Sequence, residues 1–548
     1  MKNTGGSELV AQLEGYGVDT VFGMPGVHTL SFFDPLAKST IRHIGARHEQ
    51  GAGFMADGYA RATGKPGVCL IISGPGVTNA ATPIGQAYSD SIPVLAVTSA
   101  IARADMGLGR GMLHEITSQQ AVTAPITGFS ATALTGQQIG EHLARAMASF
   151  QTERPRPVHI SIPLDVLDEE VVPRPTRKFL PRRPGPNPID IRAAADLIRA
   201  AKRPVILAGG GCRNAGAELT RLVEATQAPI ITTVAGKGVV PESHPLSLGS
   251  TLQRAKIRRL VEIEADLVIA IGTEISEPDL YVTADSEAAA DGPMIADPTR
   301  LAIAGKFIRI DIDPAATVRD YVPDAAIVSD AGLAAAALVE ELGRQPAGLI
   351  AWKVDFAALK NQVKQDVSPL ERQHIAVLEA VREALPADAL VYADMTQIAY
   401  TGCVYFPVDI PGTWHFPVGY GTLGYALPAA IGGSVGSPDR ACAAIVGDGG
   451  LLFTVQELAT AVEQKLPLPI LLWDNDGLGE IADFMRARNI PEVSVRPLNP
   501  DFKALGEAFG CLVAVPHSLD EIGNEIRRAL RADRPTIIIV KQDAGYLR

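Results

Sequence analysis

The segment from residue 441 to 480 constrains the fold more than any other part of this chain. An apolar run at 441–446 predicts a buried parallel strand, which ends in the turn Gly447-Asp448-Gly449-Gly450. A second apolar run at 468–473 leads into Asp474-Asn475-Asp476-Gly477. Two parallel strands joined by a right-handed crossover end at the same edge of a sheet. We therefore expect Asp448 and Asn475 to meet at that edge.

The segment between the two runs predicts a helix, with Phe453, Leu458, Ala461 and Val462 near one face. Its start after Gly450 points a helix N-terminus, which favours anions, at the same edge. Carboxylate, amide and carbonyl oxygens in this number suit Mg²⁺. The segment therefore predicts a diphosphate held through a divalent metal. The alternative is that the glycines only form turns and the acidic side chains are solvated.

The spacing of these motifs resembles the thiamine diphosphate signature, in which GDG is followed about thirty residues later by NN. Here the first Asn of the pair is Asp474, whereas the second is retained as Asn475. The resemblance implies that Mg²⁺ is ligated by Asp448, Asn475 and the carbonyl of Gly477. It also implies cofactor contacts from the residues around these ligands: Gly447, Gly449, Gly450, Leu478 and Gly479.

Two other segments resemble acetolactate synthase-type thiamine enzymes. The run from Arg47 to Arg61, RHEQGAGFMADGYAR, resembles the segment that carries the catalytic glutamate, which would make Glu49 the partner of the aminopyrimidine ring. The run SGPGVTN adds Ser73 and Asn79 as cofactor contacts. In Gly419–Pro428, Gly421 would accept a hydrogen bond from the cofactor, and Leu423 would be the apolar wedge that bends it.

Apolar strands alternate with helical patterns along the whole chain, which predicts an α/β fold of three doubly wound parallel-sheet domains. The expected domains are a pyrimidine-binding domain at 1–170, a central domain at 189–342 and a diphosphate-binding domain at 370–548. Connectors are expected at 171–188, which is rich in Pro and Arg, and at 343–369. The first and last domains share a strand–helix rhythm without a sequence repeat.

Composition limits the function classes. The formal net charge of −12 argues against non-specific binding of nucleic acid or anionic membranes. The N-terminal residues lack an apolar signal region, and no apolar run reaches the length of a membrane span. Five scattered cysteines without a CxxC motif are typical of a cytoplasmic enzyme with reduced thiols.

Several polar residues are candidates for contact with substrate. His28, after Val27, follows the position where decarboxylases of this superfamily often carry an acid, although a hydrogen-bonded loop histidine is an equal alternative. His114 and Glu115 stand where acetolactate synthases carry Gln-Glu and pyruvate decarboxylases His-His. Histidine titrates near neutral pH and can therefore deliver a proton.

Glu480 stands where acetolactate synthases carry an apolar residue of the substrate pocket. Burying a carboxylate there has a large desolvation cost unless it pairs with a cation, and a cationic substrate would supply that partner. Together with RHEQGAGFMADGYAR and LHEI, the segment DNDGLGEI resembles 5-guanidino-2-oxopentanoate (2-ketoarginine) decarboxylases, a branch of the acetolactate synthase-like family. The competing interpretation is that Glu480 pairs with Arg486 or Arg488.

The leading hypothesis is non-oxidative decarboxylation of a 2-oxo acid to an aldehyde and CO₂. The alternatives are a carboligase that joins 2-oxo acids and a non-enzymatic protein with a thiamine-enzyme fold. FAD is not expected, because the stretch 270–277 lacks the arginine and paired aspartates of the flavin segment in acetolactate synthases. In this family the two halves of the site meet between subunits, which implies a homodimer or homotetramer.

Overall fold

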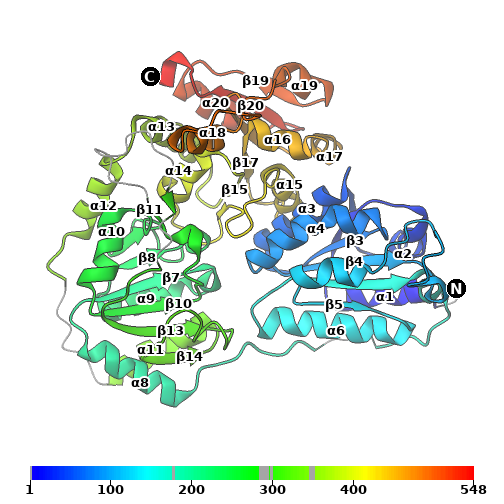
Figure 1. Ribbon diagram of the computed structural model, residues 1–548, viewed down its shortest axis with the longest axis horizontal. Coiled ribbons are helices and arrows are strands. Elements are labelled where there is room, and N and C mark those ends of the chain that lie inside the picture. Colours follow the sequence, from blue (N-terminus) through cyan, green and yellow to red (C-terminus); the bar gives the residue numbers. More distant parts are fainter. Residues whose placement is uncertain (1–2, 176–178, 283–294, 297–299, 345–351, 548) are drawn as a thin grey trace.

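Three six-stranded parallel sheets, flanked by helices, form the protein (Figure 1). The computed structural model describes residues 3–175, 179–282, 295–296, 300–344 and 352–547. The strands are short, mostly buried apolar runs of the kind that parallel sheets covered on both faces require. This arrangement confirms the predicted α/β class of three doubly wound parallel sheets.

The first sheet has the strand order β2-β1-β3-β4-β6-β5. Its strands are β1 Thr20–Gly23, β2 Arg42–Gly45, β3 Gly67–Ile71, β4 Val94–Ala100, β5 Phe129–Thr132 and β6 Val158–Pro163. Its helices are α1 Gly5–Gly15, α2 Leu30–Leu36, α3 Glu49–Thr63, α4 Pro75–Ser89, α5 Gln119–Thr123, α6 Gly136–Thr152 and α7 Leu164–Asp168.

The third sheet repeats this order as β16-β15-β17-β18-β20-β19, which explains the rhythm that the first and last parts of the sequence share. Its strands are β15 Leu390–Ala393, β16 Trp414–His415, β17 Cys442–Gly447, β18 Pro469–Asp474, β19 Leu512–Ala514 and β20 Thr536–Lys541. Its helices are α13 Pro369–Ala384, α14 Gln397–Tyr405, α15 Ala426–Gly436, α16 Asp448–Thr454, α17 Glu457–Glu463, α18 Gly479–Ala487, α19 Phe502–Ala508 and α20 Leu519–Ala529.

The middle sheet has a different order, β14-β13-β10-β7-β8-β9. Its strands are β7 Pro204–Ala208, β8 Ile230–Thr232, β9 Ser247–Gly249, β10 Leu267–Ile271, β13 Lys306–Asp311 and β14 Ala325–Val328. Its helices are α8 Pro188–Ala200, α9 Gly216–Thr226, α10 Ala255–Arg259 and α11 Ala331–Arg344. A two-stranded antiparallel ribbon, β11 Tyr281–Val282 and β12 Ile295–Ala296, lies outside this sheet.

Two local expectations were wrong. The expected connector at 343–369 contains a helix in its described part, α12 Phe356–Gln365, because Phe356 and Val363 bury their side chains against the middle domain. The single helix expected after Gly450 is instead two short helices, and the first of them begins at Asp448. Leu458 and Ala461 are buried as expected, but the Phe453 side chain is 52% exposed.

The first and third sheets are held together by a close crossing of α3 and α15 (Figure 1). A Cβ added to Gly58 would lie 2.0 Å from the Ala429 carbonyl oxygen, and one added to Gly432 would lie 1.9 Å from that of Met55. The backbones therefore meet only because both positions are glycine. This crossing fixes α3, which begins with Glu49, against the domain that carries Asp448.

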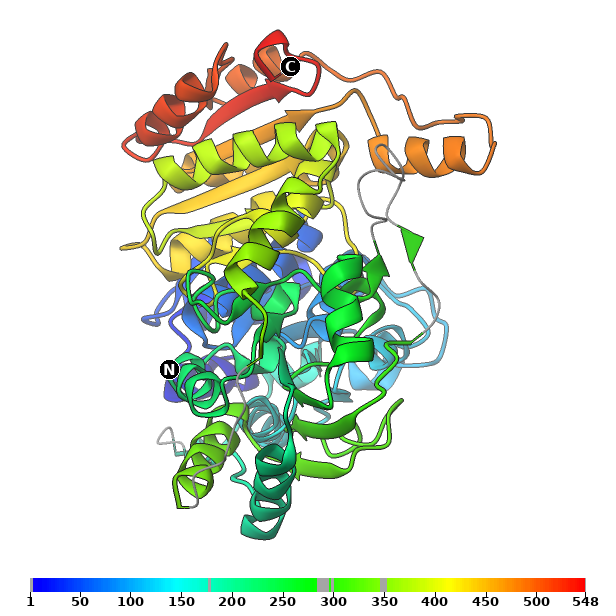
Figure 2. The same cartoon turned by 90° about the vertical axis from the view of Figure 1, so that its left-hand side faces the viewer.

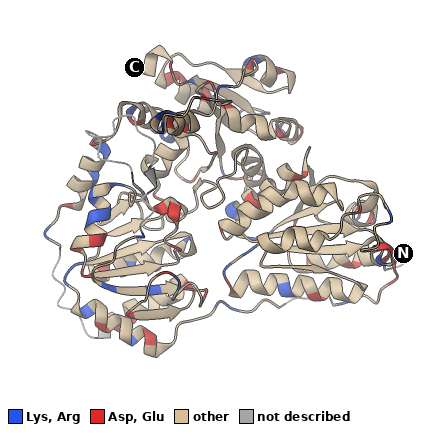
Figure 3. Ribbon diagram, viewed as in Figure 1, with Lys and Arg blue, Asp and Glu red and all other residues tan. Residues whose placement is uncertain are grey.

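Acidic and basic residues are interspersed along the helices of all three domains (Figure 3). Within the described residues, none of the helices is both long and apolar enough to cross a bilayer. All five cysteines are buried free thiols.

Candidate functional site

Asp448 and Asn475 lie at the carboxyl ends of two paired strands. Strands β17 and β18 are parallel neighbours in which Gly447 is opposite Trp473, so the residues that follow each strand face one edge of the sheet. The Asn475 amide oxygen lies 3.1 Å from Asp448 Oδ1 and 2.8 Å from the Gly477 carbonyl oxygen. The structure thus brings the three predicted metal ligands together.

Hydrogen bonds orient the Asp448 carboxylate within this oxygen cluster, which we define as Asp448 Oδ1, Asn475 Oδ1 and the Gly477 carbonyl. Oδ2 of Asp448 accepts from the Gly477 N–H and from Asn499 Nδ2, both at 2.7 Å. Burial raises the pKa of Asp448, opposed by these bonds. Oδ1 is left to face the other two oxygens.

Three oxygens at these separations repel one another unless a cation or a hydrogen lies between them. Carboxylate, amide and carbonyl oxygens are the ligand types that Mg²⁺ accepts, with water and phosphate oxygens completing its shell. The oxygen cluster therefore fits a magnesium ion. Gly477, at φ +136°, is needed here because an added Cβ would lie 2.2 Å from the Val495 carbonyl oxygen.

Asp474, the departure from the NN pair, has a partner of its own. Its side chain is buried, Oδ1 accepts from the Asp476 N–H at 3.2 Å, and Oδ2 lies 3.2 Å from Lys541 Nζ. Asp474 and Lys541 are opposite each other on β18 and β20. The substitution is therefore balanced by a lysine on the neighbouring strand and leaves the oxygen cluster intact.

The other residues predicted to contact cofactor surround this edge. A Cβ on Gly450 would lie 3.0 Å from Asp394 Oδ2, and one on Gly449 would lie 3.2 Å from a methyl group of Leu478. Gly421, at φ +65°, lies in the loop before α15, and Leu423 in the same loop is half-buried. The Gly424 N–H holds this loop in place by donating to both carboxylate oxygens of Asp394, at 3.0 and 3.1 Å.

Glu49 is the first residue of α3, after His48 as N-cap. Glu49 Oε2 accepts from Asn79 Nδ2 at 3.0 Å, which brings together two residues predicted to contact cofactor. Gly76 allows this contact, since an added Cβ would lie 3.3 Å from Glu49 Oε1. In the single chain Glu49 is only half-buried and Asn79 is exposed, so this chain alone does not shield the Glu49 carboxylate from water.

His28 and His114 form a pair. Their Nδ1 atoms are 3.3 Å apart, the rings are T-shaped with centroids 4.7 Å apart, and His28 Nδ1 is also 2.9 Å from Ser73 Oγ. Burial, and then the neighbouring His114, lower the pKa of His28. Val27 beside it is 64% exposed.

The backbone of His114 is in the left-handed region, at φ +63°. Its carbonyl oxygen would lie 2.5 Å from a Cβ added to Gly74, so glycine at position 74 allows the histidine to approach. A strained backbone at a residue with a chemical side chain is characteristic of functional sites.

Glu115 is placed differently from its neighbour. Its Oε2 accepts from the Met112 N–H at 2.9 Å, and this bond is the main cause of the lowered pKa of Glu115. Glu115 thus closes the turn from Met112 to Glu115, which carries His114.

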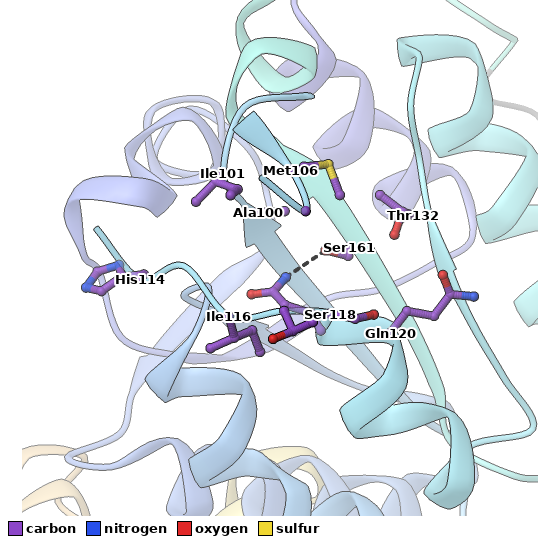
Figure 4. A pocket seen from close by; sticks show the side chains of 12 residues that line it. Ala100, Ile101, Met106, His114, Ile116, Ser118, Gln120, Thr132 and Ser161 are labelled. Atoms are coloured by element: carbon purple, nitrogen blue, oxygen red, sulfur yellow. Dashed lines mark hydrogen bonds between the residues drawn. The ribbon is translucent and has the colours of Figure 1, made fainter. Parts of the chain in front are cut away.

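A cavity of about 120 Å³ lies beside His114 in the first domain (Figure 4). Ile116, Ser118 and Gln120 line one side of it, and the lining residue Gln119 donates to Ser161 at 2.8 Å. The 12 lining residues carry no carboxylate. A carboxylate that pairs with a cationic substrate group would therefore have to lie outside this cavity.

Glu480 is the second residue of α18, a helix that extends beyond the third sheet (orange in Figure 2). It is half-buried rather than buried, and its Oε2 accepts from Gln397 Nε2 at 3.3 Å. Arg486 pairs with Asp483 at 2.8 Å and with Glu492 at 3.0 Å, and Arg488 lies over the Phe484 ring.

Two residues in contact with the predicted metal ligands were not themselves predicted. Gln397 binds Asn475, and Asn499 binds Asp448. Gln397 follows strand β15, which pairs with β17, so its place at the same sheet edge was a usable signal. Asn499 lies in irregular chain after α18 and carries no such signal.

Three family models match the chain in order. They are the thiamine pyrophosphate enzyme N-terminal TPP binding domain at residues 3–122, the central domain at 191–338 and the C-terminal TPP binding domain at 394–540. The chain belongs to the thiamine pyrophosphate enzymes.

Curated relatives of this thiamine pyrophosphate enzyme agree over nearly its whole length. A probable 2-ketoarginine decarboxylase of Pseudomonas aeruginosa is 48% identical over 540 residues, covering 98% of this chain and 93% of the relative. A probable acetolactate synthase large subunit of Methanocaldococcus jannaschii is 34% identical, covering 98% and 92%. The acetolactate synthase isozyme 1 large subunit of Escherichia coli is 35% identical, covering 87% and 82%.

Proposed function

We propose that this enzyme decarboxylates a 2-oxo acid to an aldehyde and CO₂ without oxidation, using thiamine diphosphate and Mg²⁺, and that 5-guanidino-2-oxopentanoate is its substrate. The observation that carries the proposal is the oxygen cluster of Asp448, Asn475 and Gly477. Mg²⁺ bound there would hold the diphosphate. The name of the 48% identical relative supports the substrate.

Thiamine diphosphate, when bound, supplies a nucleophilic carbon and an electron sink. The chain supplies the remaining functions. Glu49 shares a proton with the aminopyrimidine ring, and Asn79 keeps the Glu49 carboxylate in place at 3.0 Å. Leu423 would pack against the cofactor, and the Gly421 carbonyl would accept a hydrogen bond from it.

The histidine pair favours decarboxylation, because release of an aldehyde needs a proton where CO₂ has left. His114 is the proposed donor. His28 is kept predominantly uncharged by its lowered pKa, and its Nδ1 is shared between His114 and Ser73. Glu115 contributes by holding the loop that carries His114.

Glu480 is the proposed partner of the substrate guanidinium. It lies at the start of α18, five residues after the metal ligand Asn475, on a half-buried surface where an ion pair is partly protected from water. The cavity beside His114 has no carboxylate to compete for the cation.

A carboligase reaction is the second candidate, and it is favoured by the acetolactate synthases at 34% and 35% identity. Both functions use the same cofactor and metal. They differ in whether the aldehyde equivalent is released or joined to a second 2-oxo acid.

The proposed assembly is a homodimer or homotetramer in which one subunit supplies Glu49 and another the oxygen cluster. Half-buried Glu49 and exposed Asn79 support it, because both need covering to exclude water. Light scattering of the purified holoenzyme measures the assembly. The five free thiols support a cytoplasmic location. We also propose that the enzyme binds no flavin, and the absorption spectrum of the pure protein tests this.

The experiment that tests the function is a screen of 2-oxo acids for CO₂ release with aldehyde trapping, with and without thiamine diphosphate and Mg²⁺. We expect cofactor-dependent release from 5-guanidino-2-oxopentanoate. Release that is equal without either cofactor would contradict the proposal.

A further inference from the structure

Gln397 lies between the oxygen cluster and two carboxylates of α18. It is the first residue of α14 and its side chain is 8% exposed. Its Oε1 accepts from Asn475 Nδ2 at 3.1 Å. Its Nε2 donates to Asp483 Oδ2 at 2.9 Å and to Glu480 Oε2 at 3.3 Å. Both ends of this amide are therefore engaged, and the carboxylate end accepts only its NH₂ group.

The orientation of Asn475 decides whether the oxygen cluster can bind metal. With the amide as it stands, its oxygen faces Asp448 Oδ1 and the Gly477 carbonyl. If the amide turned over, its nitrogen would donate to both of these oxygens, at 3.1 and 2.8 Å. Without a cation, the turned orientation gives the better contacts with Asp448 and Gly477. It nevertheless presents an NH₂ group where the metal needs an oxygen ligand.

Gln397 opposes this turn. A turned Asn475 would set its oxygen 3.1 Å from Gln397 Oε1, and two amide oxygens cannot share a hydrogen bond. Gln397 cannot turn to compensate, because its oxygen would then face the carboxylates of Asp483 and Glu480. The negative charge of the two acids thus fixes Gln397, and Gln397 fixes Asn475.

The Asn475 and Gln397 side-chain amides are tightly packed against Gly479. A Cβ added to Gly479 would lie 2.5 Å from Asn475 Nδ2 and 2.7 Å from Gln397 Oε1. The first residue of α18 therefore lies directly against the hydrogen bond that joins the two amides.

We propose that Gln397 is a positioning residue for the metal, which together with Asp483 and Glu480 holds the Asn475 amide oxygen toward Mg²⁺ before the ion arrives. This inference rests on the metal site of the proposed function. It gives Glu480 and Asp483 of α18 a role in orienting the metal ligand that is separate from contact with substrate.

The test is the affinity of the apoenzyme for Mg²⁺ at saturating thiamine diphosphate, measured by isothermal titration calorimetry. Gln397→Leu should weaken Mg²⁺ binding by roughly 10- to 100-fold, the range for losing an outer partner of a metal ligand. Gln137→Leu is the matched control, because Gln137 donates only to Glu141 on the surface helix α6. The melting temperature without metal checks that both variants fold.

A second pair of variants tests the carboxylate end. Asp483→Asn removes the charge that orients Gln397 and weakens an ion pair with Arg486 at 2.8 Å, three residues on. Asp196→Asn weakens an ion pair of the same spacing and distance, with Arg199, in the middle domain. We expect weaker Mg²⁺ binding from Asp483→Asn and wild-type binding from Asp196→Asn.

Failure of this inference and failure of the proposed function give different results. If the wild type binds Mg²⁺ no better than Asp448→Ala, the metal site itself is misplaced. If wild-type binding depends on Asp448 but folded Gln397→Leu binds as tightly as the wild type, only the positioning role is overturned. Equal losses from Asp483→Asn and Asp196→Asn would also overturn it.

Discussion

The amide oxygen of Asn475 lies 3.1 Å from Oδ1 of Asp448, at the ends of two paired strands. Both atoms are acceptors, and Asp448 Oδ2 is already satisfied by two N–H donors. The two oxygens repel each other, and a cation between them would remove this repulsion. If the proposed Mg²⁺ binds there and holds the diphosphate, cofactor binding depends on metal binding.

Asp448→Ala should therefore weaken Mg²⁺ and thiamine diphosphate binding together. We expect losses above about 100-fold, since removing a ligand costs more than removing an outer partner. Titration of the apoenzyme with each component measures this. Unchanged cofactor affinity would show that the diphosphate is held elsewhere.

Glu49→Gln should leave folding and cofactor binding nearly intact while lowering kcat by roughly 10²- to 10⁴-fold. Glutamine keeps the shape of the side chain and can still bind Asn79, but it cannot share a proton. The measurement is steady-state turnover beside cofactor affinity. Near-normal turnover would remove Glu49 from the chemistry.

Glu480→Gln should reduce kcat/KM for 5-guanidino-2-oxopentanoate by about 30-fold, corresponding to about 2 kcal/mol. This is the low end of the range for charge pairs, because Glu480 is half-buried. An uncharged 2-oxo acid of similar length should be affected much less.

The two substrates must be compared at saturating Mg²⁺, because Glu480 also contacts Gln397. Asp483→Asn serves as the control, since it alters the same amide without the proposed substrate contact. Equal losses on both substrates in Glu480→Gln would exclude recognition of the cation by this residue.

Buried His159 makes stability depend on pH. Burial lowers the pKa of His159 to about 4, below its value in the unfolded chain. As the pH falls below about 6.5, the unfolded chain takes up a proton that the folded protein excludes, so the free energy of unfolding decreases. The expected loss from this residue is about 2 kcal/mol at pH 5 relative to neutral pH.

The measurement compares melting temperatures at pH 7.5 and pH 5 for the wild type and His159→Gln. Glutamine can replace the bonds to Thr98 and Thr123 but does not titrate. The variant should lose less stability on acidification. A loss equal to that of the wild type would contradict the assignment.

The central strands of each sheet could be predicted from apolar runs in the sequence, but most edge strands could not. In the three six-stranded sheets, five strands that no apolar run of the sequence marks, β2, β5, β9, β14 and β16, all lie at sheet edges. An edge strand pairs on one side only, so it can be short or partly polar; β5, for example, is half-buried along its length. Apolar runs do not mark such strands.

For the site, motif spacing brought the predicted metal ligands Asp448 and Asn475 to one sheet edge, because each follows one of two neighbouring strands. The contacts of Gln397 and Asn499 depend on how α14 and the chain after α18 pack, which spacing does not encode. Helical periodicity put Phe453 near the same face as Leu458 and Ala461, but Phe453 is 52% exposed whereas the other two are buried.

The most direct test of the account is the product balance of the holoenzyme on 5-guanidino-2-oxopentanoate alone and on pyruvate alone. Decarboxylation releases one CO₂ and one free aldehyde for each 2-oxo acid consumed, whereas carboligation releases one CO₂ for every two and no aldehyde. We predict equimolar CO₂ and aldehyde from the guanidino substrate, with little turnover of pyruvate. Formation of acetolactate from pyruvate, without free aldehyde from either substrate, would contradict the account.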